Sequence, residues 1–265
     1  MAEIYMRSRL ALRRDRVFDE TTRIQLVTAI VLLAAYEGIA QSGLLYQDVV
    51  PSLIAIVRAL FALVTTGEFY FHLSVTVIEI TVAFLIGTFI GVTAGICFGL
   101  WRLLGEVLDP WVHYLAPTPK IIFLPITVLF FGTGISSKIA MGSLSAFFPV
   151  AVATYAAMRL VRPVLVRVAK SFNATTWQTV RFVYLPSLVM PVISSMRIGL
   201  GATVIGVLLT EIKMSQVGLG NLIVQDYNFF RIPEMYSLLL VIFAVAWAGN
   251  TGMELLAKRL SHFGP

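Results

Sequence analysis

Long apolar runs separated by short polar segments dominate this chain. Six of them are about twenty residues long, the length that a helix needs to cross the ~30 Å hydrocarbon core of a bilayer. They are Ile24 to Leu44, Leu73 to Leu100, Pro110 to Phe131, Ile139 to Met158, Val192 to Ile212 and Tyr236 to Ala257. The pattern predicts an all-α transmembrane fold with about six spanning helices in one membrane domain, residues 24–257.

A shorter apolar run, Ser52 to Thr66, follows Pro51. Arg58 interrupts this run, and counting it as a span would invert every later helix and spoil the charge asymmetry of the loops. We therefore expect an interfacial or packed helix on the outer side.

The positions of Lys and Arg predict the orientation. With the N-terminal segment 1–23 in the cytoplasm, fifteen of the twenty Lys and Arg residues fall in cytoplasmic segments when Arg197, near the start of the fifth run, is counted among them, as the positive-inside rule requires. The same arrangement places the loop 159–191 and the tail 258–265 in the cytoplasm. We expect a multi-pass protein of the lipid bilayer with both termini cytoplasmic.

Composition supports this picture and narrows the chemistry. Of the 265 residues 58% are hydrophobic and 13% charged, whereas soluble domains carry about 25% charged residues. The formal net charge is +6, but the basic residues flank the apolar runs and do not alternate with stacking aromatics, which argues against a nucleic-acid partner. The only cysteine is Cys97, and the three histidines lie far apart, so we expect no disulfide and no metal site.

Glycine recurs every fourth residue in the second run. Gly87, Gly91, Gly95 and Gly99 lie on one face of a helix, and such small-residue faces allow close helix packing in lipid. The contact is either static or moving; the spacing does not distinguish the two.

The third run contains a lysine and several prolines. Its prolines are Pro110, Pro117, Pro119 and Pro125, and each removes a backbone donor. Freed carbonyls at membrane depth are tolerated only against protein or a water-lined cavity. Lys120 therefore lines a translocation path or snorkels to an interface.

Glu79 and Glu211 fall toward the outer ends of their runs. Water or a basic partner would reach them there, and Glu211 is a second candidate for the path. The alternative for both is a role as helix-end anchor or packing partner, because a proton relay needs more such groups in series.

Catalytic signatures are missing. The segment Gly132 to Lys138 resembles a phosphate loop only superficially, since it lacks the glycine before the lysine and the hydroxyl residue after it. Its glycines favour a tight turn instead. Without a nucleophile elbow or a zinc-protease motif, we expect no catalytic residue and no cofactor bound by this chain, which is therefore not predicted to be an enzyme.

The basic loop 159–191 has its own helical pattern. Between Arg159 and Pro186 it carries five basic and no acidic residues. Asn173 is suited to the left-handed conformation that ends a helix, and Thr175 or Thr176 to capping the next one. We expect a helix, a turn and a second helix that Pro186 stops.

This loop resembles the Glu-Ala-Ala coupling motif of ABC importer permeases, in the branch for nitrate, taurine and other sulfonates. Arg167-Val168-Ala169 occupies the first part of the motif, Asn173 the place of its glycine, and Val183 to Pro186 its last part, with the spacing intact. Other segments resemble this branch in the same order: Pro119 to Pro125, Phe131 to Lys138, Phe147 to Pro149, Arg197 to Gly201 and Gly218 to Ile223. Two positions depart from the motif, since Arg167 replaces its glutamate and Asn173 its glycine.

The resemblance implies a type I ABC importer permease fold, whose helix-turn-helix contacts an ATPase, in a bacterial inner membrane. It implies two ATPase subunits, which bind ATP and Mg²⁺, a second permease subunit, with a homodimer the simpler assumption, and a periplasmic solute-binding protein. The residues that would couple to the ATPase are Arg167, Ala169, Ser171, Phe172, Asn173, Ala174, Trp177, Leu185 and Pro186.

Two other classes of function stay open from the residues alone. An ion-driven secondary transporter or channel would need no ATPase, and a membrane enzyme would need clustered catalytic groups. The basic balance and Lys120 favour a small anion as solute, and the resemblance implies one such as a sulfonate, nitrate or bicarbonate, without identifying it.

Overall fold

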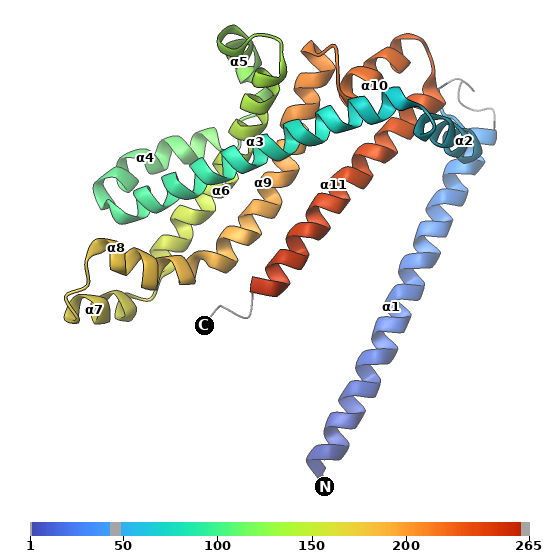
Figure 1. Ribbon diagram of the computed structural model, residues 1–265. Coiled ribbons are helices and arrows are strands. Elements are labelled where there is room, and N and C mark those ends of the chain that lie inside the picture. Colours follow the sequence, from blue (N-terminus) through green and yellow to red (C-terminus); the bar gives the residue numbers. More distant parts are fainter. Residues whose placement is uncertain (1, 43–48, 261–265) are drawn as a thin grey trace.

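The computed structural model describes the backbone of residues 2–42 and 49–260, with side chains from Glu20 onward apart from those of Arg102 and His113. The described chain is almost entirely helical, and Figure 1 labels its elements. In order they are α1 (Ala2–Gln41), α2 (Leu53–Val64), α3 (Gly67–Leu100), α4 (Arg102–Leu115), η1 (Lys120–Phe123), α5 (Leu124–Phe131), α6 (Ile135–Leu160), α7 (Pro163–Ser171), α8 (Thr176–Thr179), η2 (Val180–Tyr184), α9 (Leu185–Met214), α10 (Leu219–Asn228) and α11 (Ile232–Leu260).

Five helical segments are long and apolar enough to cross a membrane. They cover 20–41, 67–100, 135–160, 176–214 and 232–260, so the all-α transmembrane class is confirmed. The remaining expected span is the third run, Pro110 to Phe131, and the prediction that it forms one continuous helix is wrong. It is broken at residues 116–119 between α4 and η1, because Pro117 and Pro119 lack the backbone donors that a helix needs there.

The glycine face predicted on α3 packs against α6. Gly87 meets Ser143, whereas Gly99 meets Met158, so the two helices run parallel. A Cβ at Gly95 would lie 2.5 Å from the Cβ of Thr154, so only glycine permits this approach. Because α3 and α6 run in the same direction, the broken segment α4–η1–α5 must return the chain from one end of the bundle to the other.

The remaining helices complete the bundle around this pair. α9 lies antiparallel to α6, since Gly199 meets Val150 and Gly206 meets Ser145. α11 packs along α3 and α9 through two apolar clusters, one around Phe69 and one around Met253. The segment α7 to η2 is the loop predicted to contact an ATPase and is called the coupling loop below. In Figure 1 the coupling loop, the start of α1 and the end of α11 lie at one end, and α5 and α10 at the other.

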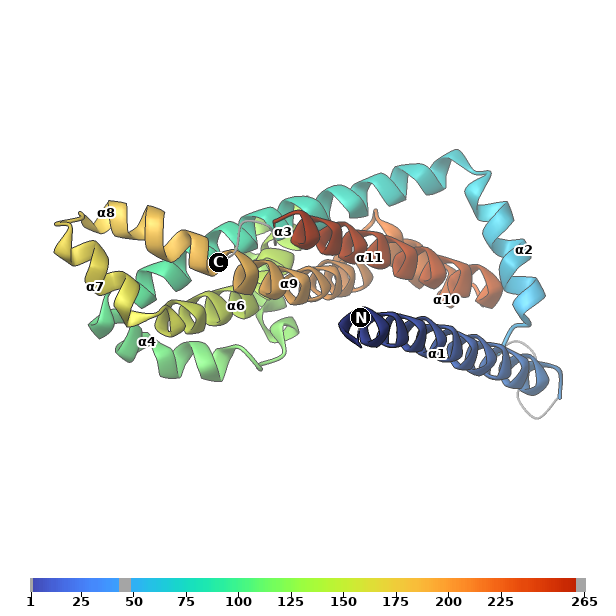
Figure 2. The same ribbon diagram turned by 90° about the horizontal axis from the view of Figure 1, so that it is seen from below.

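α1 stands apart from the bundle, as Figure 2 shows. Its described apolar side chains are exposed, including Ile30 at 63%. The hydroxyl of Tyr36 donates to the Pro51 carbonyl at 2.9 Å, and the Leu53 amide donates to Glu37 at 2.8 Å. These bonds join α1 to α2, which is the short packed helix expected from the Ser52 to Thr66 run.

Candidate functional site

The coupling loop, α7 to η2, has the predicted helix-turn-helix architecture. Asn173 has a φ of 52°, and its amide donates to the Lys170 carbonyl at 2.9 Å while the Ala174 amide donates to the Ala169 carbonyl at 3.0 Å. These two bonds form a Schellman motif, which satisfies the last carbonyls of α7. The positive φ explains why asparagine replaces glycine with little penalty, because asparagine tolerates this region better than most residues.

The second helix of the loop begins with a reciprocal cap. The Gln178 amide donates to Thr175 Oγ1 at 3.3 Å, and the Thr175 amide donates to the Gln178 side chain at 2.8 Å. This capping box fixes the start of α8. The alternative cap, Thr176, is the first residue of the helix instead.

The prediction that Pro186 ends this helix is wrong, because the helical path continues from Thr176 to Met214. Residues Val180–Tyr184 form a π-turn, in which the Leu185 amide donates to the Val180 carbonyl. The extra residue in this turn places Pro186 in the first turn of α9, where its missing N–H is not needed. The π-turn therefore joins the coupling loop to α9 without a break.

Large apolar side chains project from the loop. Phe172 is 82% exposed and Trp177 66%. The other predicted coupling residues are exposed or half-buried: Arg167, Ala169, Ser171, Asn173, Ala174, Leu185 and Pro186. An exposed apolar patch of this kind marks an interaction surface, and it lies at the end of the bundle beyond α6 (Figure 1).

A groove follows α6 and α9 from the coupling loop toward α5. One cavity of about 610 Å³ is lined by Met141 and Pro149 of α6, by Ile205 of α9 and by Lys120. A second, of about 520 Å³, continues it to Arg162, and both are lined by Ala153. We call this joined feature the α6–α9 groove.

Lys120 lies at the wall of this groove, but its ammonium group is already engaged. It donates to the carbonyls of Leu115, Ala116 and Thr118 at 2.7, 2.8 and 2.6 Å. It also lies 4.5 Å from the centre of the Phe148 ring, a cation–π contact. Lys120 thus caps the broken end of α4 and holds it against α6.

Glu211 does not line the groove. Its side chain is fully buried, and it accepts hydrogen bonds from Thr76 Oγ1 and from the Gly220 amide, both at 2.7 Å. Of the two path candidates, only Lys120 therefore reaches the groove. Glu211 matches its alternative as a packing partner, because it joins α9, α3 and α10.

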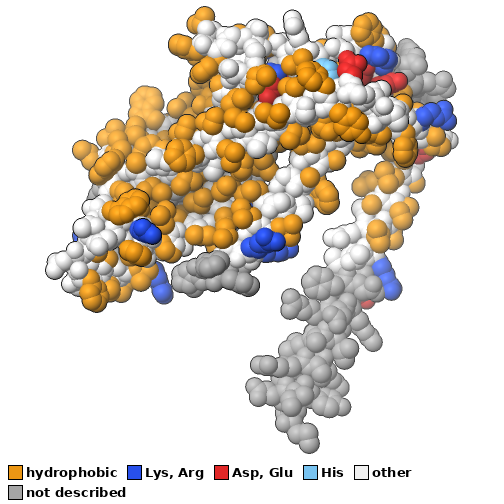
Figure 3. Space-filling view, viewed as in Figure 1, with side chains coloured by type: hydrophobic (Ala, Val, Ile, Leu, Met, Phe, Trp, Pro, Cys, Tyr) orange, Lys and Arg blue, Asp and Glu red, His pale blue; other side chains and the backbone are white. Residues whose placement is uncertain are grey.

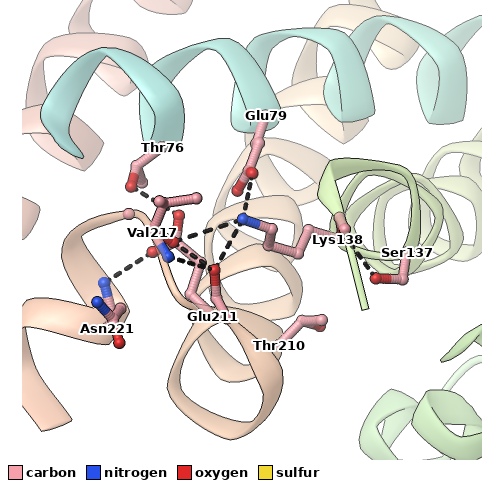
Figure 4. Close-up of polar contacts among 12 residues, drawn as sticks. Thr76, Glu79, Ser137, Lys138, Thr210, Glu211, Val217 and Asn221 are labelled. Atoms are coloured by element: carbon pink, nitrogen blue, oxygen red, sulfur yellow. Dashed lines mark hydrogen bonds and ion pairs between the residues drawn. The ribbon is translucent and has the colours of Figure 1, made fainter. Parts of the chain in front are cut away.

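A buried ion pair lies beside Glu211 (Figure 4). Lys138 Nζ is 2.5 Å from Glu79 Oε1, and Nζ also donates to Ser215 Oγ at 2.9 Å. The sequence had suggested a basic partner for the carboxylates without identifying Lys138. The signal available was its position at the start of an apolar run, at the same outer end as Glu79 and Glu211.

The glycines of the segment 218–223 make room for this cluster. Gly218 has a φ of 107°, and a side chain there would overlap the Glu211 carboxylate. A Cβ at Gly220 would lie 2.6 Å from the Glu211 Cβ. The turn before α10 is thus built around one buried carboxylate, which accepts from the Gly220 amide, while the Gly218 and Leu219 amides donate to His72 Nδ1 and Thr76 Oγ1.

Side-chain chemistry is distributed unevenly over the surface. Figure 3 shows hydrophobic side chains over much of the visible face of the bundle, with most Lys and Arg toward its ends. Among the described residues no group of three or more His, Cys, Asp or Glu is placed to hold a metal ion. The arrangement offers a surface at one end and a groove along the membrane-crossing helices.

Comparison with known proteins agrees with this geometry. The family described as "Binding-protein-dependent transport system inner membrane component" matches residues 87–262. The taurine transport system permease protein TauC of Escherichia coli K12 is 30% identical over 190 residues, which are 72% of this chain and 69% of TauC. The putative aliphatic sulfonates transport permease protein SsuC of Bacillus subtilis 168 is 27% identical over 87% of this chain and 83% of its own.

A solved structure supports the fold. The inward-facing MetNI methionine ABC transporter contains a chain that superposes with a TM-score of 0.63 at 18% identity, over 78% of this chain and 97% of that one. At this level of identity the likeness concerns the fold alone.

Proposed function

Because the chain belongs to the family of binding-protein-dependent transport system inner membrane components, it is an ABC importer permease subunit, and we propose that it carries a small anion along the α6–α9 groove. The observation that carries the proposal is the exposed coupling loop. Its caps fix both helices, and Phe172 and Trp177 project from it at 82% and 66% exposure. A separate ATPase subunit would cover this patch, and burying aromatic side chains dominates interface energetics.

We assign the energy source to that partner. Two ATPase subunits would bind ATP and Mg²⁺, one at each coupling loop of a permease pair, and the second permease would be another copy of this chain. The continuous helix from Thr176 to Met214 supports the mechanism, because a displacement of the loop reaches α9 through unbroken helix. This also favours the importer over an ion-driven transporter, for which such a loop has no use.

A periplasmic binding protein would deliver solute to the opposite end. This places the coupling loop and both termini in the cytoplasm of a bacterium, and α10 outside. Exposed aromatic side chains support a contact there: Tyr227 is 63% exposed, Phe229 71% and Phe230 79%.

The proposed solute is a small anion of the sulfonate, nitrate or bicarbonate kind. The groove supports this class, since Lys120 and Arg162 line it and no Asp or Glu is among its described lining residues. The relatives named for taurine and aliphatic sulfonates point in the same direction.

Co-purification tests the proposal. The tagged permease is expressed with a candidate ABC ATPase subunit from the same genome, as wild type and with Phe172 and Trp177 both changed to Ala. We expect the double variant to insert in the membrane but to lose the ATPase, whereas Phe229→Ala, an exposed aromatic at the other end, retains it. Equal recovery of the ATPase with the double variant would contradict the docking assignment.

A further inference from the structure

Arg197 is an exposed arginine in the middle of the membrane-crossing helix α9. Its Nε donates to Asn250 Oδ1 on α11 at 3.1 Å. With Ser194, Ile198 and Asn250 it lines a cavity of about 350 Å³. A charge within a span is costly and normally faces protein or water, so this guanidinium needs a polar neighbour.

The Arg197 cavity adjoins the α6–α9 groove. Ile198 lines both, and α9 exposes one stripe of side chains along the groove that includes Pro191, Ser194, Ile198 and Ile205. Arg197 precedes Ile198 by one residue, so it lies at the edge of this stripe, on the side where Asn250 of α11 accepts from its Nε. It borders the groove through the shared Ile198.

The charged residues that line the groove are of one sign. Lys120, Arg162 and Arg197 line its parts, and the described lining residues of the three cavities include no carboxylate. Glu254, one turn beyond Asn250 on α11, interacts electrostatically with Arg197, and its carboxylate is paired with Lys258 at 2.9 Å. A bound anion would thus meet attraction along the groove, with Glu254 as a competing carboxylate beside the Arg197 cavity.

Within the membrane-crossing part of the groove, Arg197 has donors available for a solute, whereas Arg162 lies at the end of the groove next to α7. The ammonium group of Lys120 already donates to three carbonyls. Arg197 uses only Nε within the described residues, so its two terminal amino groups are available. Those groups form a planar fork that matches two oxygens of one oxyanion, and Asn250 fixes the direction of the fork.

We propose that Arg197 is an oxyanion subsite of the translocation groove, positioned by Asn250. The charged end of the solute pairs with the guanidinium, and Ile198 and Ile205 contact an apolar remainder. Small alkanesulfonates fit this division between a charged end and an apolar tail. The inference rests on the proposed function, because it takes the groove to be the solute path.

Anion-dependent thermal stability of the full-length permease tests the subsite. The protein is placed in phosphatidylcholine nanodiscs, and ethanesulfonate is exchanged for chloride at constant ionic strength. We expect ethanesulfonate to raise the melting temperature of wild type, and the apparent affinity to fall about tenfold or more in Arg197→Gln, because a charge-assisted contact is lost. Arg197→Lys keeps part of the effect, and Asn250→Ala weakens it.

The matched control is Arg58→Gln, which removes an exposed arginine of α2 outside the groove and leaves the shift at the wild-type size. An equal shift in Arg197→Gln, or none in wild type, overturns the subsite. So does a loss of co-purifying phosphatidylglycerol in Arg197→Gln without any ethanesulfonate effect, which would assign Arg197 to a lipid headgroup. Because no ATPase is needed, a failed subsite leaves the co-purification test intact, and the reverse also holds.

Discussion

Lys138 Nζ lies 2.5 Å from Glu79 Oε1 beside the turn that precedes α10, and both side chains are almost fully buried. The pair joins α6 to α3, and the Ser215 and Glu211 bonds extend it to α9 and the turn before α10. A buried pair of this kind contributes little beyond an apolar replacement, but breaking it strands a charge.

Removing the lysine alone should therefore be severe. We expect Lys138→Met to destabilise the permease by about 3–5 kcal/mol, because it leaves Glu79 buried without its cation. Thermal unfolding in detergent measures the loss. The double variant Glu79→Gln with Lys138→Met should recover most of the stability, and a double variant no more stable than Lys138→Met would contradict the ion-pair account.

The contact between α3 and α6 predicts a sharp difference between two glycines. Gly95→Ala should lower the melting temperature and the yield of folded protein, because its Cβ would lie 2.5 Å from the Thr154 Cβ and 2.8 Å from the Ala151 carbonyl oxygen. Gly252→Ala on α11 is the control, since no atom lies within 4 Å of the added Cβ. Size-exclusion profiles and melting curves compare the two variants. Equal behaviour would show that α3 and α6 can move apart far enough to admit a side chain.

The turn at Asn173 predicts an ordering of substitutions. Asn173→Gly should be tolerated, whereas Asn173→Val should destabilise the turn by about 1–3 kcal/mol, because a β-branched residue is strained at a φ of 52°. Hydrogen exchange of the Asn173 and Ala174 amides reads the turn directly. ATPase co-purification then reports its effect on docking, and a valine variant with unchanged exchange would refute the assignment.

Substitutions of Lys120 and of Arg197 should have different effects on the ethanesulfonate shift. Lys120→Met should increase protease cleavage near residues 115–119, because three carbonyls lose their shared donor. The ethanesulfonate shift should stay within about twofold of wild type, since a saturated ammonium offers a solute little. Loss of that shift in Lys120→Met would instead make Lys120 the anion contact.

Those parts of the fold that depend on the local pattern of residue types could be predicted from the sequence. The glycine face of α3, the turn at Asn173, a cap at Thr175 or Thr176 and most of the spans follow from periodicity and backbone preference. The effects of two prolines on their helices were predicted wrongly, in opposite directions. Pro117 lies in a break within an expected span, whereas Pro186 sits in a helix expected to stop, because a π-turn supplies one additional residue before it.

The residues of the site were harder to predict from the sequence, because they come together only in the folded structure. Glu211 and Lys138 are distant in sequence, and nothing local distinguishes a buried carboxylate from one that lines a path. Arg197 was counted with the cytoplasmic basic residues and as part of a resembling segment, whereas the structure places it in the middle of α9. Its neighbour Asn250 lies on another helix, and the shared Ile198 that links their cavity to the groove appears only once α6, α9 and α11 are assembled.

The close contact between the glycine face of α3 and α6 should make these two helices move together. α6 leads directly into α7, and the contact extends from Gly87 to Gly99 without space for a side chain. The proposed displacement of α7 would therefore move α3 together with α6, because the two helices have no room to slide apart at these glycines. The groove between α6 and α9 would change shape with them.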